Sequence, residues 1–152
     1  DKKIMVWGGV SGKVVGILHR MRGNMDKNQC TEILDQPLIP SARQMFGEEP
    51  YTSQQDNDPK HKAIATREYM TRINILVIHC PSQSPDLNPI ESLWSILDYM
   101  AKARHPRNEN EFFEILKEEW GKITVSILRR VAESMHRRLD AVIKANGYTT
   151  KY

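Results

Sequence analysis

Two acidic residues, Asp56 and Glu91, are of a type and in a setting that could bind divalent metal ions. Thirty-four residues lie between them. Asp56 ends a short predicted strand and Glu91 lies in the first turn of a predicted helix, so the two could converge where the strands of an α/β sheet end. Mg²⁺ prefers oxygen ligands and usually takes only one or two protein carboxylates together with phosphate oxygens. Two such ions, about 3.5 to 4 Å apart, can stabilise both the attacking and the leaving oxygen of a phosphoryl transfer.

The same acidic residues also allow a purely structural interpretation. Asn88, Pro89 and Glu91 have the spacing of a helix N-cap, a first-turn proline and a capping-box Glu, whose side chain would bond back to the Asn88 N–H. Asp58 before Pro59 is typical of a helix start and nothing more. Taken without other information, this spacing favours capping over catalysis for Glu91.

Strands and helices that would position these acids alternate along the chain. Strands are predicted at residues 4–10, 14–18, 51–56 and 73–80, the last one buried because of its run of β-branched residues. Between residues 26 and 45 one helix is predicted, followed by an irregular turn because of Pro37 and Pro40. Further helices are predicted at 58–72, 90–103, 108–121 and 125–146. The apolar face of the last helix is predicted to consist of Ile127, Leu128, Val131, Met135, Leu139, Val142 and Ile143. This order predicts an α/β sheet with a C-terminal helical layer.

Composition and charge place the chain among folded, soluble proteins. Its 152 residues fit one domain, 1–152, and 39% hydrophobic with 27% charged residues exclude a disordered tail. No apolar run approaches the roughly 20 residues that span a bilayer, and the Asp1-Lys2-Lys3 start is not a secretory signal, so neither a membrane partner nor export is expected. Cys30 and Cys80 lack the spacing of a zinc site and are expected to be reduced thiols. The net charge of +3 suits a phosphate-bearing partner but is common elsewhere too.

Four segments of this sequence resemble the Tc/mariner superfamily of DDE transposases. They are Met5-Val6-Trp7-Gly8-Gly9, Gln54-Gln55-Asp56-Asn57-Asp58-Pro59-Lys60-His61, Ser84-Pro85-Asp86-Leu87-Asn88-Pro89-Ile90-Glu91-Ser92-Leu93-Trp94 and Ala145-Asn146-Gly147-Tyr148. The gap of 34 residues is also that of the Tc branch. The resemblance implies an RNase H-like mixed sheet flanked by helices, with Asp56 as the second and Glu91 as the third catalytic acid. It further implies two Mg²⁺ or Mn²⁺ ions, DNA (transposon ends and target) as partner, a homodimer of the full-length protein and a nuclear location.

Several other residues are secondary candidates for this chemistry. Asn57 and His61 match family positions near the site, although a lone first-turn His is more often structural. Possible contacts to DNA phosphates are Lys60, Lys62, Arg129, Arg130, Arg137 and Arg138. The four arginines form one broad basic face on the last predicted helix, where they could bind phosphate oxygens, and a solvated surface is at least an equal alternative. Trp7, Trp94 and Trp120 are expected in the core rather than as platforms for bases.

The sequence departs from the family pattern at its start. The family's first catalytic Asp lies on a central strand well ahead of Met5, so we expect the chain as given to be truncated at the N-terminus, inactive and marginally stable. The unusually polar segment Thr52-Ser53-Gln54-Gln55 is compatible with a decayed copy, and we expect no helix-turn-helix module within these residues. A non-catalytic DNA-binding or interaction module is the alternative function. A general nuclease of the same fold is a third, less favoured possibility.

Overall fold

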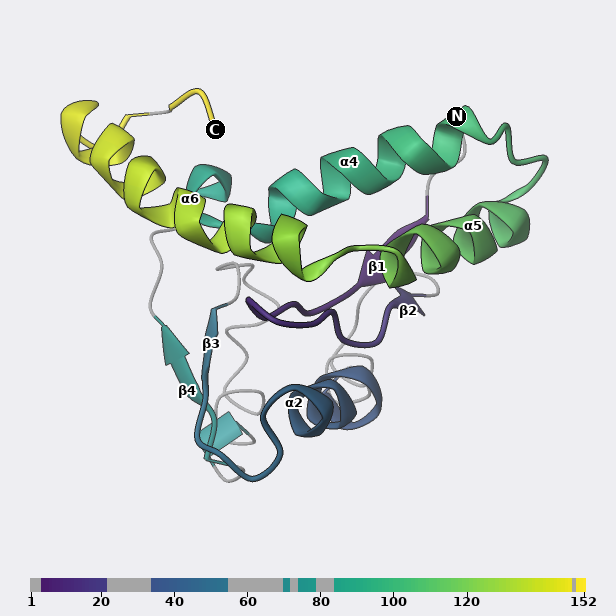
Figure 1. The fold of residues 1–152 in the computed structure, drawn as a ribbon, viewed down its shortest axis with the longest axis horizontal. Helices are drawn as coiled ribbons and strands as arrows, with labels where there is room; N and C mark the ends of the chain where they lie inside the picture. Colours follow the sequence, from purple (N-terminus) through teal and green to yellow (C-terminus); the bar gives the residue numbers. More distant parts are fainter. Residues whose placement is uncertain (1–3, 22–33, 55–69, 72–73, 79–83, 149) are drawn as a thin grey trace.

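Four short strands in the computed structural model form two separate pairs (Figure 1). The structure describes residues 4–21, 34–54, 70–71, 74–78, 84–148 and 150–152. Strand β1 (Met5–Trp7) pairs antiparallel with β2 (His19–Met21). Strand β3 (Thr52–Gln54) pairs in parallel with β4 (Leu76–Ile78). Both pairing directions of a mixed sheet are therefore present, although within these ranges the two pairs are not hydrogen-bonded to each other.

The predicted hairpin forms, but its second strand lies further along the chain than residues 14–18. Only a single bridge, Val10 with Val15, joins the turn region, and regular pairing begins at His19. Between these points the Gly16 N–H still donates across the hairpin to the Gly9 carbonyl at 2.8 Å, but other backbone groups bond to other elements. The Ile17 N–H donates to Ser41 Oγ at 2.8 Å, and the Gly16 carbonyl accepts from Trp120 Nε1 at 2.7 Å. Hydrogen bonds to α2 and α5 thus replace part of the strand pairing in this segment.

The chain is helical around its two closely spaced prolines, where the irregular turn was predicted. A π-helical turn, η1 (Leu34–Leu38), contains Pro37 and leads into α2 (Ile39–Phe46). That prediction is wrong because Pro40 falls in the first turn of α2, where a missing N–H costs no hydrogen bond. The predicted helix start at Asp26 lies outside the described residues, as do the predicted helix start at Asp58 and both cysteines.

The C-terminal half forms the predicted helical layer. It consists of a 3₁₀ turn, η2 (Pro85–Leu87), followed by α4 (Ile90–Ala103), α5 (Glu109–Gly121) and α6 (Val125–Lys144). Asn108 caps α5, because its side chain accepts from the Glu111 N–H at 2.9 Å. The Glu111 carboxylate in turn accepts from the N–H of Arg107, whereas in an ideal capping box it would accept from the N–H of the N-cap residue, Asn108. No helix among the described residues is long and apolar enough to cross a membrane.

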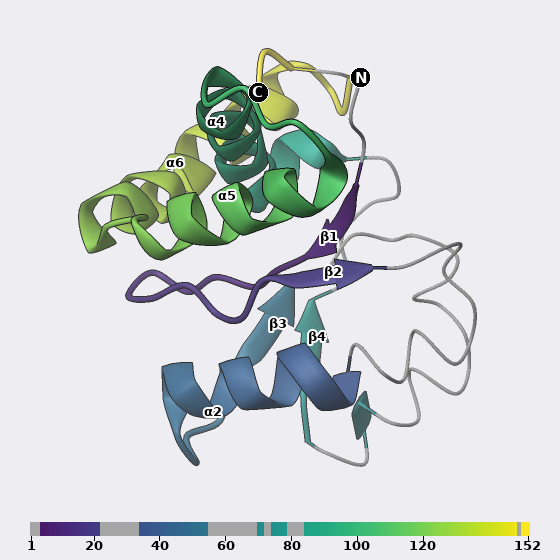
Figure 2. The same cartoon turned by 90° about the vertical axis from the view of Figure 1, so that its right-hand side faces the viewer.

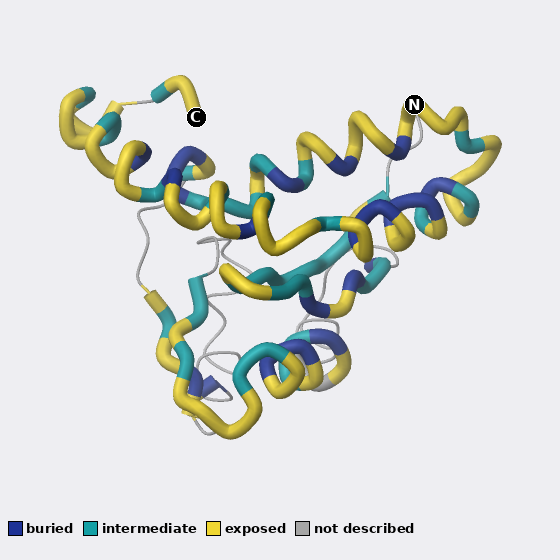
Figure 3. The backbone as a smooth tube through the Cα atoms, in the orientation of Figure 1, coloured by how far each residue is buried: buried dark blue, intermediate teal, exposed yellow. Residues whose placement is uncertain are grey.

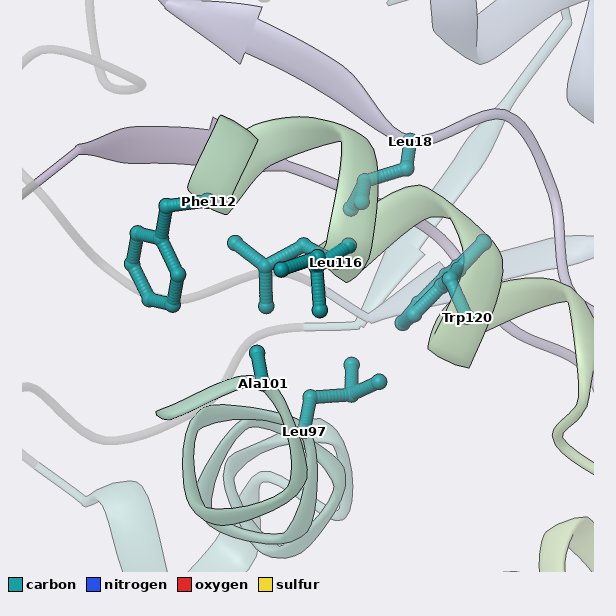
Figure 4. Packing of buried hydrophobic residues seen from close by; sticks show 7 residues of the cluster. Leu18, Leu97, Ala101, Phe112, Leu116 and Trp120 are labelled. Atoms are coloured by element: carbon teal, nitrogen blue, oxygen red, sulfur yellow. The ribbon is translucent and has the colours of Figure 1, made fainter. Parts of the chain in front are cut away.

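The main hydrophobic core lies between α4, α5 and the β1–β2 hairpin. Figure 2 shows α4, α5 and α6 on one side of the hairpin and α2 on the other. Buried residues concentrate where α4 and α5 face each other (Figure 3). The core residues are Leu18, Leu97, Ala101, Phe112, Ile115, Leu116 and Trp120, and Figure 4 shows how they pack. The ring of Trp120 also stacks on Trp94, with centroids 5.2 Å apart, so the expectation that these two tryptophans belong to the core is confirmed.

Two predicted apolar faces are exposed in part. In β4, Leu76 is 68% and Ile78 47% exposed, so the prediction of a fully buried strand is wrong. In α6, Leu139 and Ile143 are exposed, and the buried positions are Leu128, Ser134 and Arg138. The face of α6 that packs on the rest of the chain is therefore rotated from the apolar stripe, and it includes a buried guanidinium.

Candidate metal and nucleic-acid site

Glu91 lies exposed in the first turn of α4, as predicted. The turn before it is built by backbone bonds: the Asn88 N–H donates to Pro85 O at 3.0 Å, and the Glu91 N–H donates to Asn88 O at 3.2 Å. Asn88 Oδ1 accepts from the Ile90 N–H at 3.4 Å. The turn η2 and the start of α4 thus form one continuous hydrogen-bonded unit, which presents the carboxylate of Glu91.

The other acid, Asp56, lies outside the described residues, together with Asn57, Lys60, His61 and Lys62. Its strand is described as far as Gln54, two residues earlier. The Gln54 side-chain amide donates to the carbonyl of Leu87 at 2.6 Å, and Leu87 stands four residues before Glu91. This bond joins the end of β3 to the unit that presents Glu91, so the chain segments next to the two acids are side by side.

Gln54 is a residue of the site that was not predicted from the sequence. The polarity of residues 52–55 was interpreted as compatible with decay, whereas Gln54 makes a specific contact with the carbonyl of Leu87, which is 8% exposed. The polar segment was itself the signal, since a polar side chain in a covered strand needs a hydrogen-bonding partner.

Arg138 is a correction to the predicted basic face. Its side chain is 4% exposed, and its donors are used inside the protein. Nε donates to Ser134 Oγ at 2.9 Å, Nη1 to Asp86 O at 3.1 Å and Nη2 to Ser92 Oγ at 2.6 Å. A surface contact to phosphate is therefore closed to this residue.

The other three arginines of that face, Arg129, Arg130 and Arg137, are exposed. Their positions on α6 leave them open to an anionic partner. In the described part of the chain, to which Asp56 does not belong, no group of three His, Cys, Asp or Glu side chains could hold a metal ion.

The ionisable group with the clearest structural role lies away from these residues, on α5. The Glu119 carboxylate accepts from Lys122 Nζ at 2.7 Å and from Arg104 Nη1 at 3.1 Å. These hydrogen bonds, that of Lys122 foremost, hold the pKa of Glu119 below its ordinary value of 4.5, against the opposing effect of burial. Glu119 therefore stabilises the helical layer as an anion.

Comparison with known proteins adds family information to this geometry. The model of the DDE superfamily endonucleases matches residues 2–113. The transposase of the Caenorhabditis elegans transposable element Tc1 is 40% identical over 149 residues, which are 98% of this chain and 54% of the relative. The Tcb1 transposase of Caenorhabditis briggsae is also 40% identical, with the same coverage. The chain thus spans about half the length of the curated relatives it matches.

Solved structures of the Mos1 transposase share the fold. The Mos1 catalytic domain with Raltegravir and Mg superposes with a TM-score of 0.84 at 16% identity, covering 97% of this chain and 77% of that one. The Mos1 paired-end complex with the left transposon end gives a TM-score of 0.83 at 18% identity, covering 99% and 45%. At such identities the likeness concerns the fold alone, and it confirms the predicted RNase H-like architecture.

Proposed function

This chain belongs to the DDE superfamily of endonucleases, in its Tc/mariner transposase branch, and we propose that it supplies part of an active site that cuts and joins DNA with divalent metal ions. One observation carries the proposal: the 2.6 Å hydrogen bond from Gln54 to Leu87, which ties the strand leading to Asp56 to the turn leading to Glu91. Residues that are far apart in sequence are thereby held where two carboxylates can serve one site.

Asp56 and Glu91 are the residues proposed to hold Mg²⁺ or Mn²⁺. Their donor chemistry fits, because hard divalent cations prefer carboxylate oxygens and Glu91 stands exposed at a helix start. The solved Mos1 catalytic domain contains Mg, which supports the choice of ion. Bound ions of this kind stabilise negative charge on the oxygens of a phosphodiester during displacement. The role of the chain is to fix the two carboxylates relative to each other, through β3, η2 and α4, with Asn57 and His61 proposed to lie nearby.

DNA is the proposed partner. The exposed Arg129, Arg130 and Arg137 offer planar guanidinium groups that suit phosphate oxygens, and Lys60 and Lys62 are proposed to add further contacts. The Mos1 neighbour in complex with a transposon end supports this partner. For the whole protein we propose a homodimer and a nuclear location, which follow from the family resemblance alone.

Residues 1–152 by themselves are proposed to be inactive. By the family pattern they supply the second and third of three acids, and the first stands on a strand that precedes Met5. The same strand would join the β1–β2 and β3–β4 pairs into one sheet. Without that acid, the loss of metal-assisted charge stabilisation slows the reaction by about 10² to 10⁴.

The test compares DNA nicking by residues 1–152 and by the chain extended upstream to the length of its relatives. The extended chain should nick DNA only with Mg²⁺ or Mn²⁺, and Asp56→Ala or Glu91→Ala should lower the rate by at least about a hundredfold. Glu48→Ala, which changes an exposed acid on the loop after α2, is the matched control. Nicking by both mutants at the control rate would refute the ligand assignment. Metal-independent DNA binding without nicking by the extended chain would instead favour a non-catalytic module.

A further inference from the structure

We propose that Arg138 is a positioning residue for Glu91: it clamps the η2 turn to the first turn of α4 and so fixes where the Glu91 carboxylate stands. The proposal rests on the function proposed above for Glu91. The hydrogen bonds described for Arg138 go to Ser92, Asp86 and Ser134. Its action would pass through Ser92, which is adjacent to Glu91 in the chain, and through Asp86 in η2.

The three hydrogen bonds of Arg138 join three separate elements. Nη2 donates to Ser92 Oγ in α4, Nη1 donates to the Asp86 carbonyl in η2, and Nε donates to Ser134 on α6 itself. The partners in α4 and η2 are 46 and 52 residues away along the chain. A guanidinium offers such divergent donors in one rigid plane, which an ammonium group does not. The side chain therefore holds the turn and the helix start in a fixed relation to α6.

A second set of contacts closes over this clamp from the C-terminus. The centroid of the Tyr152 ring lies 5.0 Å from the guanidinium carbon of Arg138, and Thr150 Oγ1 donates to the Asp86 carboxylate at 3.0 Å. The chain can return in this way because Asn146 and Gly147 both adopt positive φ, of 52° and 82°. Their N–H groups bond to Ile143 O and Val142 O, which ends α6 in a Schellman-type turn.

Burying Arg138 lowers the stability of the fold relative to an apolar residue at the same position, which favours a specific structural role for its hydrogen bonds. The guanidinium is almost fully buried, and the hydrogen bonds described for it go to neutral oxygens. An apolar residue would fill the same face of α6 at lower cost, because a buried charge must be compensated for its lost hydration. What an apolar residue would not do is bond to both sides of the η2–α4 junction. Metal ligands need this kind of support, since a site functions only when its groups are held within about 0.5 Å.

Amide hydrogen exchange on residues 1–152 tests the clamp directly. Arg138→Lys keeps the positive charge but removes the planar set of guanidinium donors. Ser92→Ala removes one of the acceptors with little change in volume. Arg137→Lys, at an exposed position on α6, is the matched control. We expect exchange at the Asn88 and Glu91 amides to accelerate about tenfold or more in the first two variants, relative to the Leu116 amide in α5. Equal acceleration at all three amides, or none, would overturn the clamp.

Metal dependence tests whether the clamp serves Glu91. In the extended chain, Arg138→Lys should raise the Mn²⁺ concentration for half-maximal nicking about threefold or more, with the rate largely recovered at excess Mn²⁺. A merely structural role would lower the rate with the folded fraction and leave that concentration unchanged, which would overturn the proposal. Absence of nicking by the unsubstituted extended chain would count against the proposed function instead, while the exchange measurement still decides the clamp.

Discussion

Replacing Gln54 should destabilise the protein and separate the two halves of the candidate site. The Gln54 amide is the donor that reaches the carbonyl of Leu87 at 2.6 Å, and Leu87 is one of the two buried residues of η2. Gln54→Met preserves the length of the side chain and removes this donor. Leaving a buried carbonyl without it costs about 1 to 3 kcal/mol. For a chain of this length, that corresponds to a fall in Tm of about 3 to 10 °C.

Urea and thermal unfolding of residues 1–152 measure the stability change, with Gln44→Met as the matched control. Gln44 is an exposed glutamine on α2, so its replacement should change the unfolding free energy by no more than about 0.5 kcal/mol. In the extended chain, Gln54→Met should also slow nicking by about tenfold to a hundredfold, because Asp56 is then less firmly placed. If Gln54→Met matches Gln44→Met in both stability and nicking, the bond does not organise the site.

Three further predictions concern the helical layer. Gly8→Ala should lower the unfolding free energy in urea by about 1 to 3 kcal/mol, because a Cβ there would lie 2.9 Å from the Trp94 ring. Gly12→Ala, whose Cβ would meet open space, should have little effect, and equal costs of the two variants would contradict this packing. Trp120→Phe should cost about 2 to 4 kcal/mol, since it removes the bond to Gly16 and part of the core, and a near-neutral result in the same assay would refute that estimate. Because the pKa of Glu119 is lowered in the folded state, its contribution to folding stability is complete above pH 4.5 and is lost as the pH falls through the folded-state pKa. The difference in unfolding free energy between the unsubstituted chain and Glu119→Gln should therefore shrink between pH 6 and 3, and a constant difference would contradict this role of Glu119.

Elements governed by local rules could be predicted from the sequence. The helices α4, α5 and α6 follow from apolar periodicity, from the Asn108 cap and from Gly147 at the end, and the structure has all three. Errors arose where a distant contact overrides the local pattern. The strand predicted at residues 14–18 gives way because Gly16 and Ile17 bond to Trp120 and Ser41, which lie on other elements.

The same distinction applies to the candidate site. The position of Glu91 in the first helical turn is local, and it was predicted correctly. Arg138 was assigned to the surface because periodicity treats every arginine as solvated, whereas its acceptors lie 46 and 52 residues away. Gln54 was overlooked for a similar reason, since its partner is 33 residues distant. No pattern within one helix or strand contains information about contacts of this range.

A crystal structure of the extended chain grown with Mn²⁺ would test the central claim most directly, with anomalous scattering to locate the ions. We predict that carboxylate oxygens of Asp56 and Glu91 contact the same ion, or two ions about 3.5 to 4 Å apart. Manganese bound elsewhere, with these two side chains directed to opposite sides of β3 and α4, would contradict the account.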